Sequence, residues 1–197
     1  MNPVAPRRSD WETGDEAEVV RAAQAGDEAA FREIVRRYQR AVYRVAYGLT
    51  RNPSDADDLA QETFVRAYRA LTRFRVGEPL YPWLSKITMN LAYSLFRRRR
   101  RRPETALDPL LEAGRQWAGD DDPVAEVERR ERDQHLAAAF AELSEEHRAV
   151  LVLRVVEGLS YEDMARALSI PPGTVMSRLS RARADLKARL SARMGET

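Results

Sequence analysis

A chain of 197 residues with 44% hydrophobic and 32% charged residues has enough apolar material for small packed cores, which excludes a disordered protein. The absence of cysteine excludes disulfides and zinc–thiolate sites. No early apolar run resembles a signal peptide and none is long enough to span a bilayer, so we expect a cytoplasmic protein without membrane insertion. The net charge of +2 averages segments of opposite sign, so the local charge patterns are more informative than the total.

The first strong helical pattern follows residues 1–14, which we predict to be a flexible tail. Between Asp27 and Leu49, apolar residues recur at three- and four-residue steps, the spacing of one buried helix face. Asn52-Pro53 ends this pattern, and Ser54 with Asp57 three residues later predicts a capping box at the start of the next helix.

An acidic face is predicted on this second helix. Its apolar stripe is Ala56, Ala60, Phe64, Ala67 and Leu71. Asp55, Asp58 and Glu62 lie on a narrow face opposite that stripe, at positions i, i+3 and i+7. Because no histidine or further carboxylate completes a catalytic or metal site, a protein-docking face is the favoured interpretation.

Residues 72–81 are aromatic and basic without helical periodicity, which predicts a loop. Pro82 suits the first turn of a third helix. We expect Phe74 and Tyr81 to be exposed rings that stack on bases displaced from a duplex, whereas Trp83 is assigned to the core.

The third helix carries a basic stripe. Lys86, Asn90, Tyr93 and Arg97 lie at steps of four, three and four, so they share one side that could follow a phosphate backbone. The helix then ends in six consecutive arginines, residues 97–102. For the arginine run alone, the alternative is a solvated helix end or a nonspecific tether.

Two all-helical domains joined by an extended acidic linker are the predicted architecture. The first domain covers residues 15–102, the linker 103–133 and the second domain 134–197. Residues 103–123 contain prolines, two glycines and the acidic run Asp120 to Asp122, and a helix is expected to begin after Asp122-Pro123.

The second domain has the proportions of a helix-turn-helix around residues 169–174. Ser144, and Ser160 with Asp163, are the expected helix caps. The last helix is expected to bury its apolar stripe of Val175, Leu179, Ala182 and Leu186. The residues then left mostly toward solvent, where they could reach phosphates and base edges, are Thr174, Ser177, Arg178, Arg181 and Arg183. A plain helical hairpin with solvated arginines is the alternative.

Three segments in this order resemble the sigma-70 family, specifically its small extracytoplasmic-function (ECF) group. They are DADDLAQETFVRAYRAL (55–71), PWLSKITMNLAYSLFRRRR (82–100) and LSEEHRAVLVLRVVEGLSYEDMARALSIPPGTVMSRLSRARADLKARL (143–190). The resemblance implies sigma domains 2 and 4 and a non-enzymatic factor without cofactors that brings RNA polymerase to promoters and helps to open the DNA. The implied partners are core RNA polymerase, through its β′ clamp helices and β flap, promoter DNA and an anti-sigma factor.

The resemblance also implies roles for individual residues. The polymerase-docking positions are Asp55, Asp58, Gln61 and Glu62. The minus-ten positions are Phe74, Tyr81, Lys86, Asn90, Arg97 and Arg98, with the loop from Phe74 to Tyr81 capturing a flipped base and Asn90 close to the opening base pairs. The minus-thirty-five element is read by the helix-turn-helix. Two positions depart from the family pattern: Met176 stands where many relatives have lysine, and Ser94 where many have an acidic or amide residue.

Two other classes of protein remain open on the sequence. A helix-turn-helix regulator that binds only duplex DNA explains residues 144–190 but leaves the acidic helix and the aromatic loop without a role. A nucleic-acid-processing enzyme lacks any catalytic constellation, and no glycine-rich nucleotide loop or nucleophile with its base is present.

Overall fold

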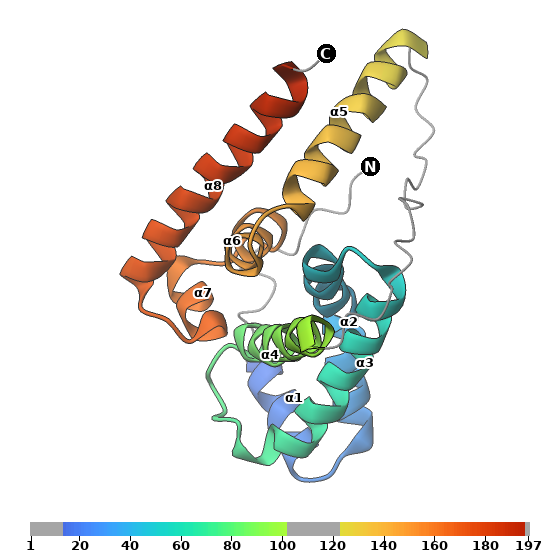
Figure 1. Ribbon diagram of the computed structural model, residues 1–197. Coiled ribbons are helices and arrows are strands. Elements are labelled where there is room, and N and C mark those ends of the chain that lie inside the picture. Colours follow the sequence, from blue (N-terminus) through green and yellow to red (C-terminus); the bar gives the residue numbers. More distant parts are fainter. Residues whose placement is uncertain (1–13, 102–122, 196–197) are drawn as a thin grey trace.

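The computed structural model describes residues 14–101 and 123–195, and within these ranges every regular element is helical. The first unit contains α1 (Gly14–Gln24), α2 (Glu28–Thr50), α3 (Pro53–Ala70) and α4 (Leu80–Arg101) (Figure 1). The second contains α5 (Pro123–Ala141), α6 (Glu145–Leu151), α7 (Tyr161–Leu168) and α8 (Pro172–Gly195). The all-helical prediction is therefore confirmed. The predicted tail, apart from Gly14, and the acidic run of the linker lie outside the described residues.

Helix α2 is the central helix of the first unit. Asp27 caps its first turn by accepting hydrogen bonds from the backbone N–H groups of Ala29 (2.7 Å) and Ala30 (3.2 Å). Its buried face is Ile34, Tyr38, Ala41, Val42, Val45, Ala46 and Leu49. The helix ends where Arg51 adopts a left-handed conformation with φ of 55°. The predicted face between Asp27 and Leu49 is confirmed in its central and C-terminal turns, whereas Phe31 and Val35 are only partly buried.

The start of α3 differs from the prediction. The cap is Asn52, whose side-chain oxygen accepts from the N–H of Asp55 at 3.0 Å, and not Ser54. Pro53 explains the difference, because a proline has no N–H to donate and its fixed φ suits the first helical position, so the cap falls on the residue before it. The apolar stripe of this helix is buried as predicted, except that Ala60 is only partly buried.

The loop between α3 and α4 is shorter than the predicted 72–81. A 3-10 turn continues α3 over Leu71–Arg73, and α4 begins at Leu80. The side chain of Gln24 donates to the carbonyl oxygens of Leu71 and Phe74, both at 2.8 Å, and a carboxylate oxygen of Glu16 accepts from the N–H of Leu80 at 3.2 Å. Helix α1 therefore fixes both ends of the loop.

In the second unit, Ser144 accepts from the N–H of His147 at 3.2 Å and Ser160 from the N–H of Asp163 at 3.1 Å, so both predicted caps are confirmed. Helix α6 continues into a π-helical turn, η3 (Val152–Val156), and the chain then turns at Gly158 with φ of 66°. Helices α5 and α8 lie side by side (Figure 1), joined by Glu142 of the α5–α6 turn, which pairs with Arg189 of α8 at 3.0 Å.

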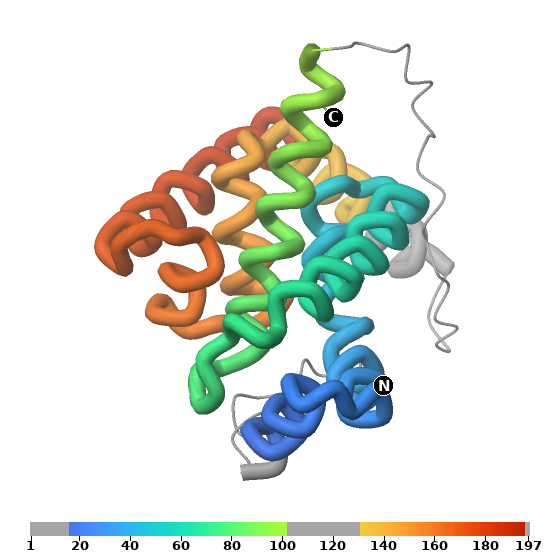
Figure 2. Tube along the Cα trace, turned by 90° about the horizontal axis from the view of Figure 1, so that it is seen from below, coloured from blue at the N-terminus to red at the C-terminus, as the bar shows by residue number. Residues whose placement is uncertain are grey.

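The two units share one apolar core in which α4 lies between α3 and the helix-turn-helix (Figure 2).

We expect Leu153→Ala, at a fully buried position of η3, to lower the free energy of unfolding by about 2–5 kcal/mol, because truncation leaves a cavity. The matched variant Val155→Ala, in the same turn and 68% exposed, should change it by less than about 0.5 kcal/mol. Chemical denaturation measures both, and equal losses would contradict this description of the core.

Candidate nucleic-acid and polymerase interface

The acidic face of α3 is partly accessible. Asp58 and Gln61 are exposed, and Glu62 is half-buried and paired with Arg66 at 2.7 Å. Asp55 is different, because its carboxylate accepts a hydrogen bond from Arg99 of α4 at 2.7 Å and one of its oxygens is buried. The arginine run thus neutralises one of the four predicted docking residues and leaves the other three on the surface of the helix.

Two exposed apolar side chains extend this face and were missed at the sequence level. Val65 lies seven residues after Asp58, and Tyr68 lies seven residues after Gln61, so each shares a side of α3 with one of the predicted docking residues. The ring of Tyr68 also packs edge-on against Phe31 with the ring centroids 4.9 Å apart. The three- and four-residue spacing of Asp58, Gln61, Val65 and Tyr68 in the sequence could have indicated that they share one side of the helix.

The basic stripe of α4 is formed as predicted at three of its four positions. Lys86, Asn90 and Arg97 are exposed, whereas Tyr93 is half-buried and burial raises the pKa of its hydroxyl. Arg97 donates to Ser94 Oγ at 3.0 Å, and Ser94 in turn donates to the carbonyl oxygen of Asn90 at 2.8 Å. Ser94, which departs from the family pattern, therefore orients the side chain of Arg97.

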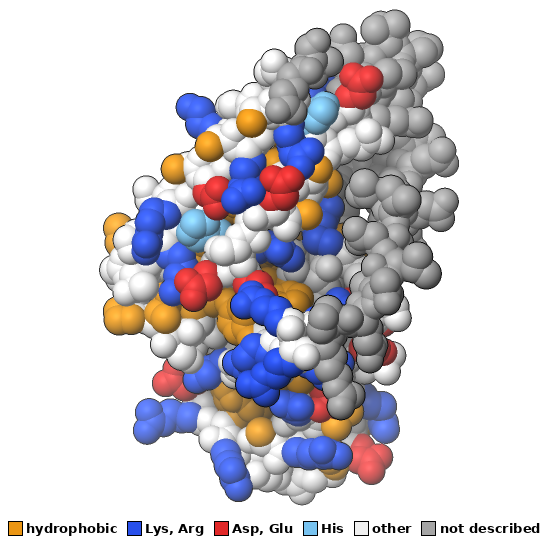
Figure 3. Space-filling view, in the orientation of Figure 1, with side chains coloured by type: hydrophobic (Ala, Val, Ile, Leu, Met, Phe, Trp, Pro, Cys, Tyr) orange, Lys and Arg blue, Asp and Glu red, His pale blue; other side chains and the backbone are white. Residues whose placement is uncertain are grey.

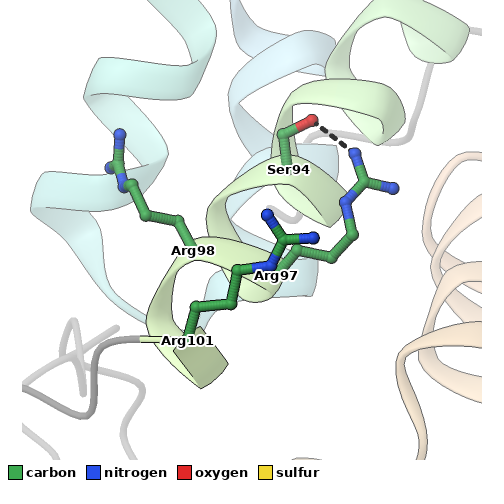
Figure 4. Close-up of a pocket in the computed structure, with 4 residues that line it drawn as sticks. All are labelled: Ser94, Arg97, Arg98 and Arg101. Carbon is green, nitrogen blue, oxygen red and sulfur yellow. Dashed lines mark hydrogen bonds between the residues drawn. The ribbon is translucent and has the colours of Figure 1, made fainter.

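The C-terminal end of α4 concentrates positive charge on one face, where Lys and Arg side chains gather (Figure 3). Ser94, Arg97, Arg98 and Arg101 line a surface hollow of about 250 Å³ (Figure 4). In Figure 4, Arg97 reaches toward Ser94 whereas Arg98 extends on another side of the helix. Such a cationic hollow suits a phosphate group of a nucleic-acid backbone.

Phe74 and Tyr81 are buried, so the prediction that their rings are exposed is wrong for this conformation. Phe74 is buried against Trp83, which is half-buried, with the ring centroids 5.0 Å apart. Tyr81 is 4% exposed, stacks on Tyr38 and donates its hydroxyl hydrogen to Glu157 of the second unit at 2.7 Å. Burial raises the pKa of Tyr81 well above its ordinary value. The rings fill the apolar space beside the loop instead of facing solvent.

The helix-turn-helix is present. After α7, Ser169 takes a left-handed conformation with φ of 56°, and α8 then buries Val175, Leu179 and Ala182 as predicted, with Leu186 partly buried. The exposed predicted DNA contacts are Ser177, Arg181 and Arg183, with Thr174 half-buried. The side chain of Arg178 is only 19% exposed and pairs with Glu146 at 3.0 Å. Met176 is exposed on the same helix.

Contacts between the two units were missed by the sequence analysis. The guanidinium group of Arg44 in α2 donates to both carboxylate oxygens of Glu157, at 2.7 and 2.8 Å, and Arg100 of α4 pairs with Glu145 at 2.5 Å. Hydrogen bonding to Glu157 raises the pKa of Arg44. Because 113 residues separate Arg44 from Glu157, no local pattern could have indicated the pair.

Within residues 14–101 and 123–195, no cluster of three or more histidine and acidic residues could hold a metal ion. None of the helices in these ranges is both long and apolar enough to cross a bilayer.

Comparisons with known proteins agree with the sequence resemblance. Residues 34–102 match the family Sigma-70 region 2, and residues 134–186 match Sigma-70, region 4. The ECF RNA polymerase sigma factor SigE of Mycolicibacterium smegmatis is 39% identical over 194 residues, which cover 96% of this chain and 74% of that relative.

Two solved structures are similar. One is CnrH in complex with the cytosolic domain of CnrY, with a TM-score of 0.65, 28% identity and coverage of 90% of this chain and 97% of that one. The other is the sigma factor RpoE in complex with the anti-sigma factor NepR from Bartonella quintana, with a TM-score of 0.63, 28% identity and coverage of 82% and 96%.

The two helical units, the helix-turn-helix and the acidic helix together define a transcription factor. The chain belongs to the ECF group of the sigma-70 family of RNA polymerase sigma factors.

Proposed function

We propose that this sigma factor binds core RNA polymerase, directs it to specific promoters and promotes opening of the DNA. The observation that carries this proposal is the presence in one chain of an acidic exposed face on α3, a basic stripe on α4 and a helix-turn-helix. The acidic face suits contact with a protein, and the basic stripe and the helix-turn-helix suit contact with two stretches of DNA. We assign no catalytic step and no cofactor to it, and we place its action in the bacterial cytoplasm.

Polymerase docking is assigned to the first unit, residues 15–102. Asp58, Gln61 and Glu62 of α3 would contact the β′ clamp helices, since accessible acidic and amide side chains on a rigid helix present charge and hydrogen-bonding groups to a basic partner without refolding. Asp55 would join them only if it exchanged Arg99 for a polymerase group. The β flap would bind the second unit, residues 134–197, with residues 103–133 as the linker.

Minus-ten recognition is assigned to α4 and the loop before it. Lys86, Asn90, Arg97 and Arg98 are accessible to DNA without rearrangement. Extruding a base costs a few kcal/mol of unstacking, and phosphate contacts with the arginines would help to offset that cost. Phe74 and Tyr81 would have to leave their buried positions to hold the base.

Minus-thirty-five recognition is assigned to α8, through Thr174, Ser177, Arg178, Arg181 and Arg183. Of these side chains only the arginines can contact a base through two hydrogen bonds, and Arg178 is paired with Glu146, so DNA shape would contribute to specificity.

We expect Arg178→Ala and Arg181→Ala each to weaken binding to minus-thirty-five duplex DNA and to lower the slope of log affinity against log salt by about one, because each removes one phosphate contact. Titrations at several salt concentrations measure the slope. Arg36→Ala, an exposed arginine of α2, serves as the control and should leave the slope unchanged. An unaltered slope in both α8 variants would place the DNA-binding surface elsewhere.

An anti-sigma factor is a further proposed partner. Both structural relatives were solved in complex with another protein, and NepR is named as an anti-sigma factor. With 28% identity to those chains, this protein has the same fold on which such a partner would bind.

The competing function is that of a regulator that binds duplex DNA alone. Co-elution of the purified chain with core RNA polymerase in size-exclusion chromatography distinguishes the two. A sigma factor elutes with the core enzyme in the absence of DNA. A duplex-only regulator elutes separately.

A further inference from the structure

Met176 is an exposed apolar side chain on α8, the second helix of the helix-turn-helix. It is the fifth residue of a helix that begins at Pro172, and it is 55% exposed. The helix begins at the outer edge of the molecule, beside α7 (Figure 1). Among the described residues of α7 and the first three turns of α8, Met176 is the one large hydrophobic side chain with such exposure.

Packing of the core does not account for Met176. Val175, Leu179 and Ala182 hold α8 against the rest of the second unit, and all three are buried. Met176 follows Val175 by one residue, which turns its side chain about 100° around the helix axis and away from the buried stripe. Among the described residues it belongs neither to the buried core nor to the side chains packed against that core. Its apolar surface is therefore left for water or for a molecule bound against α8.

The neighbours of Met176 on the helix surface are small. Gly173, Ser177 and Ser180 are all exposed, and they lie three residues before, one after and four after the methionine. A Cβ atom added at Gly173 would meet no atom within 4 Å. Met176 therefore projects beyond the surface that its neighbours form. Its unbranched, polarizable side chain can adapt to an irregular apolar surface.

The position of Met176 along α8 favours base edges over the DNA backbone. The second helix of a helix-turn-helix lies in the major groove with its N-terminal residues against base edges. Met176 is in the second turn, whereas the exposed Arg181 and Arg183 follow five and seven residues later. Those long cationic side chains suit phosphates, to which an apolar side chain offers neither charge nor a hydrogen bond.

Only some base edges suit an apolar side chain. The C5-methyl group of thymine is the apolar group that base pairs present in the major groove, where the other groups are hydrogen-bond donors and acceptors. The methionine sulfur is a weak acceptor and the side chain has no donor. Covering a donor or acceptor of another base would remove its water without replacing the hydrogen bond, which is unfavourable. The side chain therefore favours thymine.

We propose that Met176 is a specificity-determining residue of the minus-thirty-five contact, which selects a thymine by packing against its C5-methyl group. The inference rests on the proposed function for the identity of the DNA element, but not for the contact with thymine. It adds an apolar base contact to the arginine contacts and the DNA shape that are assigned to α8.

The test removes the methyl group without changing base pairing. Holoenzyme, assembled from core RNA polymerase and the full chain, first selects fragments from a promoter library randomised over the minus-thirty-five region. Each thymine of the selected element is then replaced in turn by deoxyuridine, which lacks the methyl group. At one position at least, the wild-type holoenzyme should bind about fourfold more weakly, the effect of withdrawing one methyl group from apolar contact. Competition gel shifts measure the affinity.

Three variants separate Met176 from other causes of this effect. Met176→Gln keeps the length and the helix propensity of the side chain but not its apolar character, so thymine and deoxyuridine fragments should bind equally well. This holds even if the glutamine binds the paired adenine, because that contact does not involve the methyl group. Met176→Leu should retain part of the methyl dependence. Met194→Gln removes an equally exposed methionine near the end of the same helix and should retain all of it.

The proposal would be overturned by a wild-type holoenzyme that tolerates deoxyuridine at every selected thymine. A Met176→Gln variant as sensitive to deoxyuridine as the wild type would overturn it too. Failure of the proposed function gives a different result: the holoenzyme selects no minus-thirty-five sequence, while the free chain still selects duplexes with a thymine whose methyl group matters only when Met176 is present. Selection of no sequence by either the holoenzyme or the free chain would refute both.

Discussion

The double variant Asp58→Arg, Glu62→Arg is expected to bind core RNA polymerase about a hundredfold more weakly than the wild type. Both carboxylates lie on the accessible side of α3, and an interfacial charge that loses its partner costs about 2–5 kcal/mol. Reversal adds repulsion from the basic surface that the docking face is proposed to meet. Fluorescence anisotropy of the labelled chain titrated with core enzyme measures the affinity.

The matched control is Glu18→Arg, Glu28→Arg, which makes the same change of charge at exposed positions of α1 and α2 in the same unit. It should bind within about threefold of the wild type, because charges outside a contact act mainly through screened, long-range attraction. Circular dichroism of each variant shows whether the fold is intact. Equal affinities for the docking and control variants would remove α3 from the polymerase interface.

Promoter opening should be impaired about tenfold or more by Asn90→Ala, with little effect on formation of the closed complex. Asn90 is exposed in the middle of the α4 stripe, so its loss changes a DNA-facing group without creating a cavity. Shortening the loop between Arg75 and Leu80 should have the same effect, because it removes the segment proposed to accept the extruded base. Permanganate reactivity of promoter thymines reports melting, and a gel shift at low temperature reports the closed complex.

A template with a pre-melted bubble should restore transcription by both variants, since the mismatch removes the unpairing cost that they cannot meet. Gln39→Ala, which truncates an exposed amide of α2, is the control and should melt the native promoter normally. Normal melting by Asn90→Ala and by the shortened loop would mean that the segment is a simple connector between α3 and α4.

Local patterns in the sequence predicted the helices and their buried faces well. The three- and four-residue spacing from Ile34 to Leu49 and from Val175 to Ala182 reflects helix geometry, and both sets are buried apart from Val35, which is partly buried. Caps such as Ser160 were equally readable, because a hydroxyl three residues before a backbone N–H is a purely local arrangement.

Contacts between distant parts of the chain could not be read in this way. Tyr81 was expected to be exposed because it stands among basic and turn-forming residues, but its position is decided by Tyr38 and Glu157, which are far away in the sequence. Likewise Asp55 looked like Asp58 in the helical pattern, and only the fold brings Arg99 to it. The candidate site residues could therefore be identified from the sequence, whereas their exposure and their partners depend on tertiary packing.

The central claim is that the chain is a sigma factor and not a duplex-binding regulator. The most direct test is multi-round transcription from a library of bacterial promoter fragments by core RNA polymerase, with and without the purified chain. The account predicts that defined start sites are used only when the chain is present and that the transcribed fragments share minus-ten and minus-thirty-five elements. It would be contradicted if the chain left start-site selection by the core enzyme unchanged while binding the same fragments as duplex DNA.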